Sequence, residues 1–189
     1  MIDETKIANG IEMILDGLGL EDWEFDQHLK ETPERAARGF AEVFSGYDEN
    51  PKEFLKTFEE GVYDDMLIIG PIQAYSVCSH HFLPFTMDIY IGYIPDRKII
   101  GLSKFVRIAR TFSKRLQVQE RITQEIADFI DSELQPKGTM VLIKNSEHMC
   151  MKMRGVKDPC ANVTTSAVKG VFADHSEGAR QEFLQLIKG

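Results

Sequence analysis

The sequence predicts an α+β fold in which helices are segregated from an antiparallel sheet. Helical apolar spacing occupies the N-terminal part and residues 103–134, whereas residues 66–100 and 140–172 are rich in β-forming side chains. The first strand-like runs follow one another without a helix between them, which favours an antiparallel meander over a βαβ repeat. We expect one domain over residues 61–189, with residues 1–60 as a helical appendage, because so short a segment makes a marginal core.

Two helices are expected in the appendage. The first covers residues 3–17, whose apolar side chains recur at helical spacing, and Gly17 and Gly19 end it. The second begins at Thr32-Pro33-Glu34, with Thr32 as N-cap and Pro33 at the first helical position. Its apolar stripe, expected to be buried, consists of Ala36, Phe40, Val43 and Phe44. A further short helix opens at Asn50-Pro51.

The main domain is expected to alternate blocks of strands and helices. Strands are expected over residues 66–77, 85–94 and 99–100, with a turn at Pro95-Asp96-Arg97. Two helices follow, one from Ser103 and one after a break near Leu116, and Gln135-Pro136-Lys137-Gly138 ends the second. The remaining expected elements are strands at 140–143, 149–156 and 163–172 and a last helix capped by Ser176.

Composition and charge exclude several classes of protein. The net charge of -8 disfavours a nucleic-acid partner, since a polyanion would meet net repulsion. The longest run free of polar side chains, Met66 to Ile72, is too short to span a membrane, and residues 1–6 do not begin a secretory signal. Three cysteines cannot form a complete set of disulfides, so we expect a cytoplasmic protein with metal-binding thiolates.

Two short motifs contain the residue types of a catalytic zinc site. They are Cys78-Ser79-His80-His81 and His148-Met149-Cys150. Thiolate and imidazole are preferred zinc ligands, and three protein ligands leave a fourth position for water. Spacing alone does not choose between His80, which shares a face with Cys78 on a regular strand, and His81, which a bend before Pro84 would bring to Cys78. If residues 147–153 are extended, His148 and Cys150 share one face. Cys160 is an alternative fourth ligand.

Charged residues elsewhere are candidates for binding a phosphorylated purine. A helical carboxylate such as Glu120 can accept two N–H bonds from a guanine or pterin edge. Ser103-Lys104, at a helix start, offers backbone N–H groups and a cation to phosphate, and Arg107 lies one turn on. Arg154 and Arg35 are further cations. The competing interpretation of each is a solvated surface charge.

At these residues the chain resembles GTP cyclohydrolase I, over roughly residues 30–187. The matching segments are Cys78-Ser-His-His-Phe-Leu-Pro-Phe85, Ile91-Gly-Tyr-Ile-Pro95, Gly101-Leu-Ser-Lys104, Arg115-Leu-Gln-Val-Gln-Glu-Arg121, Glu147-His-Met-Cys150 and Met153-Arg-Gly-Val156, with weaker matches at Thr32-Pro-Glu-Arg35 and Phe44-Ser-Gly-Tyr47. The resemblance implies the tunnelling fold, a four-stranded antiparallel sheet with two helices on one face. It also implies a homo-oligomer, typically a decamer, with sites between subunits.

The family's chemistry then assigns roles by position. Cys78, His81 and Cys150 correspond to the zinc ligands, and His148 to the group that moves a proton as the guanine imidazole ring of GTP opens. A second hydrolytic step releases formate. His80 and Ser103 correspond to the groups that assist the rearrangement to 7,8-dihydroneopterin triphosphate, a step shared by folate, tetrahydrobiopterin and deazapurine synthesis.

The same correspondence assigns the substrate-binding residues. Glu120, with Gln119 beside it, would hold the guanine edge. Lys104, Arg107 and Arg154 would bind the triphosphate, with Arg35 reaching in from an adjacent subunit.

Two departures from the family pattern keep an alternative open. Ser79 stands where the family usually has Glu, and Ala161, beside Cys160, stands where Ser is common. The alternative is a tunnelling-fold enzyme or binder for another purine or pterin, with a structural zinc. A pure binder would need neither His148 nor His80 as proton carriers.

Overall fold

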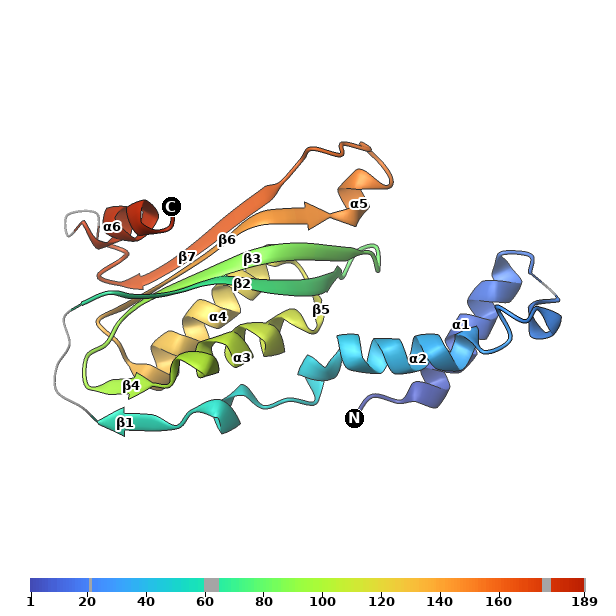
Figure 1. The fold of residues 1–189 in the computed structure, drawn as a ribbon, viewed down its shortest axis with the longest axis horizontal. Coiled ribbons are helices and arrows are strands. Elements are labelled where there is room, and N and C mark those ends of the chain that lie inside the picture. The colour runs from blue at the N-terminus through green and yellow to red at the C-terminus, as the bar shows by residue number, and fades with distance from the viewer. Residues whose placement is uncertain (21, 60–64, 175–177, 189) are drawn as a thin grey trace. The chain divides into compact units, whose positions relative to one another are not determined.

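The computed structural model describes residues 1–20, 22–59, 65–174 and 178–188 (Figure 1). The chain forms two compact units, Met1–Glu49 and Asn50–Gly189, and each is described by itself. The domain boundary expected near residue 60 falls beside residues 60–64, which lie outside the described part of the chain, as does the expected cap Ser176.

The N-terminal unit is a pair of packed helices, α1 (Glu4–Gly17) and α2 (Thr32–Val43), with short 3₁₀ turns η1 (Trp23–Phe25) and η2 (Ser45–Tyr47). Asp3 caps α1 by accepting a hydrogen bond from the Lys6 N–H at 3.0 Å. Phe44 is buried as expected, but the expectation that Val43 is buried is wrong. Val43 lies about 100° around the helix from Phe44 and so points to solvent.

The second unit is built on one twisted sheet with the strand order β5-β2-β3-β6-β7. Its four long strands, which pair with one another in antiparallel fashion, are β2 (Leu67–Cys78), β3 (Pro84–Ile94), β6 (Gly138–His148) and β7 (Val163–Gly170). The two-residue strand β5 (Leu116–Gln117) pairs in parallel with the end of β2. Separately, β1 (Thr57–Glu59) and β4 (Lys98–Ile100) form a small antiparallel ribbon.

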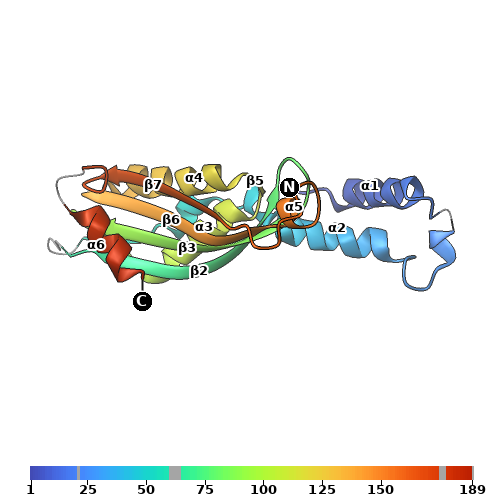
Figure 2. The ribbon, with the colours of Figure 1, turned by 90° about the horizontal axis from the view of Figure 1, so that it is seen from above.

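Two long helices cover one face of this sheet, as Figures 1 and 2 show. They are α3 (Leu102–Ser113) and α4 (Gln119–Leu134), and the 3₁₀ turn η3 (Pro51–Phe54) packs beside α3. The short helix α6 (Ala179–Leu186) packs on the other face. The predicted α+β class, with a four-stranded antiparallel sheet and two helices on one face as in the tunnelling fold, is confirmed.

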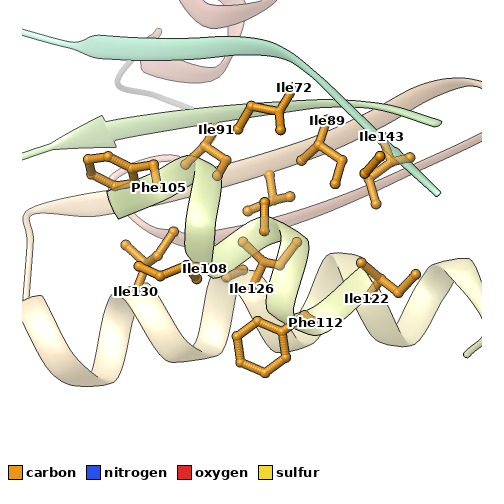
Figure 3. Packing of buried hydrophobic residues seen from close by; sticks show 14 of the residues in the cluster. Ile72, Ile89, Ile91, Phe105, Ile108, Phe112, Ile122, Ile126, Ile130 and Ile143 are labelled. Carbon is orange, nitrogen blue, oxygen red and sulfur yellow. The ribbon is translucent and has the colours of Figure 1, made fainter. Parts of the chain in front are cut away.

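The main core lies between the sheet and helices α3 and α4 (Figure 3). Ile89 and Ile91 from β3 meet Ile108 from α3 and Ile126 from α4, and all four side chains are fully buried. These residues occupy alternate positions on the strand and a single stripe on each helix, so one apolar layer seals the unit. Among the described residues, no helix is both long and apolar enough to cross a membrane.

Two strands each contain one extra residue relative to their neighbours. Between Ile69 and Ile72, β2 has one residue more than the β3 segment from Ile89 to Ile91 that pairs with it. The irregularity includes Gly70, whose φ is 156°. Between Lys144 and Glu147, β6 has one residue more than the β3 segment from Thr86 to Asp88 that pairs with it. Asn145, inside this irregularity, has a φ of 54°. A β-bulge of this kind reverses which side chains point to a given face beyond it. Ile143 therefore faces the helices before the bulge, and His148 faces them after it.

The expectation of a strand over residues 149–156 is wrong. β6 ends at His148, opposite Phe85 of β3, and Pro84 next to it cannot donate a hydrogen bond to extend the ladder. Without a neighbouring strand to pair with, the backbone after His148 forms hydrogen bonds within its own segment. It forms the short helix α5 (Met149–Lys152), in which the Met153 N–H donates to the Met149 carbonyl at 2.8 Å.

Candidate metal centre and surrounding site

Sheet register brings the predicted motifs to one end of the second unit. β5 aligns Gln117 with Cys78, and β6 aligns His148 with Phe85 at the start of β3. The turn between β2 and β3, the start of α4 and helix α5 therefore meet at this end, as both ribbon views show (Figures 1 and 2). Three segments far apart in sequence thus form a single site.

The turn between β2 and β3 carries the first motif. The Cys78 N–H donates to the Leu83 carbonyl and the Phe82 N–H donates to the Cys78 carbonyl, each at 2.9 Å. The Ser79 N–H donates to the Gln117 carbonyl at 3.0 Å, which ties the turn to β5. The chain therefore leaves the strand at Cys78, and this is the bent alternative that the sequence left open.

Cys78, His81 and Cys150 form a group that can hold a metal ion. One ligand atom from each lies within 4.8 Å of the other two. The Sγ atom of Cys78 is 3.7 Å from Nδ1 of His81 and 3.9 Å from Nδ1 of His80, but His80 is not a member of the group. Cys160 is exposed and lies outside the group among the described residues. Two thiols and one imidazole are a donor set that suits zinc.

The proximity of the two cysteines affects their acidity. Burial raises the pKa of the Cys150 thiol, and the negative charge of Cys78 and a hydrogen bond to it raise that pKa further. The positive charge of Arg154 opposes the shift. Two thiolates this close repel each other, so the deprotonated pair needs a nearby cation.

His148 sits at the centre of the site between β3 and α4. Its ring stacks on Phe85, with ring centroids 4.4 Å apart and the planes 8° from parallel. Its Nε2 atom is 2.8 Å from Oε1 of Gln119. Burial lowers the pKa of His148, and the negative charge of Glu120 partly opposes that shift. An imidazole held by a ring on one side and an amide at its edge has little rotational freedom.

Two residues of this site carry no sequence signal that singled them out. Thr123 on α4 and Thr165 on β7 join Gln119 in a partly buried cluster, with their Oγ1 atoms 2.6 Å apart. They lie 42 residues apart in the chain. Each alone is an ordinary threonine in a helix or strand, and only the packing of α4 on β7 brings them together.

The expected phosphate-binding residues of α3 are not brought to this end of the sheet. Ser103, Lys104 and Arg107 lie in the first half of α3, next to β4, whereas the end of α3 leads into β5 beside Cys78 (Figure 1). The helix is 12 residues long, or about 18 Å at 1.5 Å per residue. Within one chain, these residues and the Cys78 group are therefore separated by the length of the helix.

The two remaining expected cations have different surroundings. Arg154 follows α5 and acts electrostatically on Cys150, so it belongs to the same end of the sheet. Arg35 lies in the N-terminal unit, where it forms an exposed ion pair with Glu31 one turn earlier.

Fold and site together define a class: α+β proteins with a Cys/His metal-ligand group at the end of an antiparallel sheet. Comparisons with known proteins narrow the class. Residues 7–188 match the family model described as GTP cyclohydrolase I, and the chain belongs to this family of enzymes. It is 49% identical to GTP cyclohydrolase 1 of Aquifex aeolicus, covering 100% of this chain and 98% of the relative. It is 44% identical to GTP cyclohydrolase 1 of Clostridium kluyveri, with 99% of each covered.

A structural likeness was also found. The archaeosine synthase QueF-Like in its apo form matches 56% of this chain and 93% of its own, at 14% identity and a TM-score of 0.45.

Proposed function

We propose that this chain hydrolyses GTP to 7,8-dihydroneopterin triphosphate and formate, the reaction of a GTP cyclohydrolase I. The observation that carries the proposal is the meeting of Cys78, His81 and Cys150 with His148 and Gln119 at one end of the sheet. A metal-ligand group beside a half-buried histidine combines the two parts that a hydrolytic centre needs. Family membership supports GTP as the substrate.

Cys78, His81 and Cys150 would hold the metal, and the donor set favours zinc. When bound, a zinc ion there would supply Lewis acidity and so make water a better nucleophile near neutral pH. The charge of the ion would also relieve the repulsion between two neighbouring thiolates. Each of the three side chains is thus required for the centre.

His148 would move the proton at the purine nitrogen as the imidazole ring opens. A group in this role must be neutral before the reaction, and burial, which lowers the pKa of His148, favours the neutral ring. Phe85 stacks on the imidazole and Gln119 contacts its Nε2 atom, and both contacts restrict rotation of the ring. His80 and Ser103 would assist the later opening of the ribose and the rearrangement.

Glu120 would recognise the guanine edge, because a carboxylate can accept two N–H bonds from it. It is exposed in the first turn of α4 and acts electrostatically on His148, so it lies beside the proton carrier. Gln119 is the neighbouring candidate for the same edge. Lys104, Arg107 and Arg154 would bind the triphosphate, with Arg35 from an adjacent subunit.

The separation of the α3 residues from the Cys78 group supports a site that is shared between chains. Ser103, Lys104 and Arg107 lie at the far end of a 12-residue helix from the Cys78 end of the unit. One small substrate can contact both groups if the second group comes from a neighbouring copy. We therefore propose a homo-oligomer, a decamer as in the family, that acts in the cytoplasm.

The first test is formate release from GTP by zinc-loaded protein. We expect formate and a fluorescent pterin product in equal amounts, and we expect both to vanish in Cys150→Ala. His148→Ala should lose activity yet keep its zinc, measured by metal analysis. The matched control is Cys160→Ser, which removes a thiol that is exposed and outside the metal group and should stay active.

The outcome decides between the proposal and its alternative. Stoichiometric zinc without any formate from GTP would contradict the proposal. The next assay would then offer other purine nucleotides, because Ser79 replaces the family's usual acid beside the metal ligands. Ligand binding without turnover would indicate a purine or pterin binder with a structural zinc.

A further inference from the structure

The side chain of Gln119 is enclosed between β6, β7 and its own helix, and only 1% of it is exposed. Its Nε2 atom lies 3.0 Å from Oγ1 of Thr165 and 3.3 Å from the carbonyl oxygen of Val163. Its Oε1 atom lies 2.8 Å from Nε2 of His148. These three contacts occupy both amide hydrogens and one side of the amide oxygen.

The orientation of this amide follows from the Val163 carbonyl. A carbonyl oxygen only accepts hydrogen bonds, so the amide group that faces it must be the NH₂ and not the oxygen. With the NH₂ directed at β7, Oε1 is directed at His148. An amide oxygen also only accepts, so the imidazole must donate from Nε2.

The two threonines form a chain of hydroxyl groups with a fixed direction. The Thr123 hydroxyl donates its single hydrogen to the Gln119 main-chain carbonyl at 2.8 Å. At the 2.6 Å contact between the hydroxyls, Thr165 must therefore be the donor and Thr123 the acceptor. The Thr165 oxygen is then left to accept from the Gln119 NH₂, which reinforces the orientation that Val163 requires.

We propose that Gln119, held by Thr123 and Thr165, is a positioning residue that keeps the neutral imidazole of His148 protonated on Nε2. The lone pair is then always on Nδ1, which is the nitrogen left to exchange a proton with the substrate. Both amide hydrogens of Gln119 are engaged by β7, so its side chain has no donor left for the guanine edge, and the candidate role of Gln119 in base recognition passes to Glu120 alone. The role of Nδ1 toward substrate rests on the proposed function, whereas the protonation of Nε2 does not.

The kinetic test removes the Thr165 hydroxyl while keeping its shape. We expect Thr165→Val to lower kcat roughly three- to tenfold, the usual effect of losing one hydrogen bond, with little change in KM. Thr165→Ser restores the hydroxyl and should recover kcat. The matched control is Thr164→Val on the same strand, whose side chain is exposed and points to the opposite face.

A second measurement does not need turnover. In ¹⁵N-histidine spectra of sedimented zinc-loaded protein, we expect the neutral His148 ring to carry its proton on Nε2, with the signal assigned by its loss in His148→Gln. In Thr165→Val, a fraction of the Nδ1–H form should appear. This readout holds even if GTP is not the substrate, so failure of the proposed function and failure of the positioning role are separable.

Three results would overturn the inference. A wild-type His148 protonated on Nδ1 contradicts the donor assignment. A Thr165→Val protein with unchanged kcat and unchanged spectrum shows that the hydroxyl chain does not control the ring. A rise in KM at constant kcat would instead make Thr165 and Gln119 contribute to substrate binding.

Discussion

Cys78 ends strand β2 and Cys150 lies in helix α5, yet their sulfur atoms lie within 4.8 Å of each other. Both belong to the group whose ligand atoms lie within 4.8 Å, and both are free thiols. A disulfide needs a sulfur–sulfur distance of about 2.05 Å, so a modest movement of the α5 segment would close it. The metal and the disulfide are therefore competing states of the same two residues.

Metal removal should expose this competition. After chelation, with diamide as the oxidant that accepts the two electrons, we expect Cys78 and Cys150 to form a disulfide and only Cys160 to react with a thiol reagent under denaturing conditions. The zinc-loaded protein treated in the same way should keep its thiols. Cys160→Ser excludes pairing through the exposed cysteine, and an equal thiol count with and without chelator would contradict the prediction.

Tyr93 gives a second prediction at the level of a single residue. Its side chain is 1% exposed, its hydroxyl donates to the Lys98 carbonyl, and burial raises its pKa to about 12. The unfolded chain loses this proton near pH 10. Between these two values the folded state holds more protons than the unfolded state, so the free energy of unfolding falls as the pH rises.

The Tyr93→Phe variant isolates this effect because it lacks the titrating group. We expect the stability advantage of the wild type over Tyr93→Phe, measured by urea unfolding, to be full below pH 10 and to shrink above it. Curves for the two proteins that stay parallel from pH 8 to pH 11 would show that the hydroxyl is not responsible.

At the scale of elements, α4 holds the unit together and also carries part of the site. Ile122, Ile126 and Ile130 are fully buried against the sheet, while Gln119 and Glu120 in its first turn face the Cys78 end. Packing of the apolar stripe thus sets the depth at which the first turn meets β6 and β7. Stability and site geometry are linked through one helix.

Substitutions at Ile126 should measure this packing. We expect Ile126→Ala to lower the free energy of unfolding by about 2–5 kcal/mol and Ile126→Val by about 0.5–1.5 kcal/mol, because a cavity remains in a closely packed core. Gln124→Ala on the exposed face of the same helix should change it by less than about 0.5 kcal/mol. Equal effects at positions 124 and 126 in denaturant unfolding would contradict this account of the core.

The elements predicted best are those with a clear apolar period. The helices from residues 103 and 119 and the strands over 66–77 and 85–94 were predicted to within a few residues. The run after His148 has strand-like composition but was wrong as a strand, because whether it pairs depends on where β3 begins. Strand β5 has two residues and no period of its own, so its pairing beside Cys78 was not predictable.

The same distinction applies to the site. The motifs left His80 and His81 open as alternatives, the family resemblance assigned Cys78, His81 and Cys150, and the structure brings these three together. Thr123, Thr165 and the Val163 carbonyl act through long-range contacts between α4 and β7, which a single sequence does not reveal. The sequence also does not predict the distance of Lys104 from the metal group, because that distance depends on how α3 lies across the sheet.

At the scale of the whole molecule, the proposed site would draw its residues from more than one chain. Lys104 and His148 lie toward opposite ends of the second unit, so the triphosphate-binding and proton-moving groups of one site would come from different copies. Two defective chains can therefore complement each other if they assemble together.

Co-expression of Lys104→Ala and His148→Ala chains with different tags tests this arrangement. We expect each variant alone to be nearly inactive and the mixed assembly, purified through both tags, to regain part of the formate release, since some of its sites combine two intact halves. Mixed assemblies no more active than the two parents would place Lys104 and His148 of a working site in the same chain.

The two bulges determine which face of the sheet the side chains of Cys78 and His148 occupy. Because β2 and β6 each contain one extra residue, Cys78 and His148 face the helices, although their even positions would point away in unbroken strands. Deleting Asn145 alone would remove the extra residue of β6 but leave Glu147 opposite Thr86 and His148 opposite Phe85, so His148 would still face α4. Deleting both Asn145 and Ser146 would shift the pairing by one residue and turn Glu147 toward α4 in place of His148. The chemistry of the site is therefore encoded in the parity of residue counts as well as in residue identity.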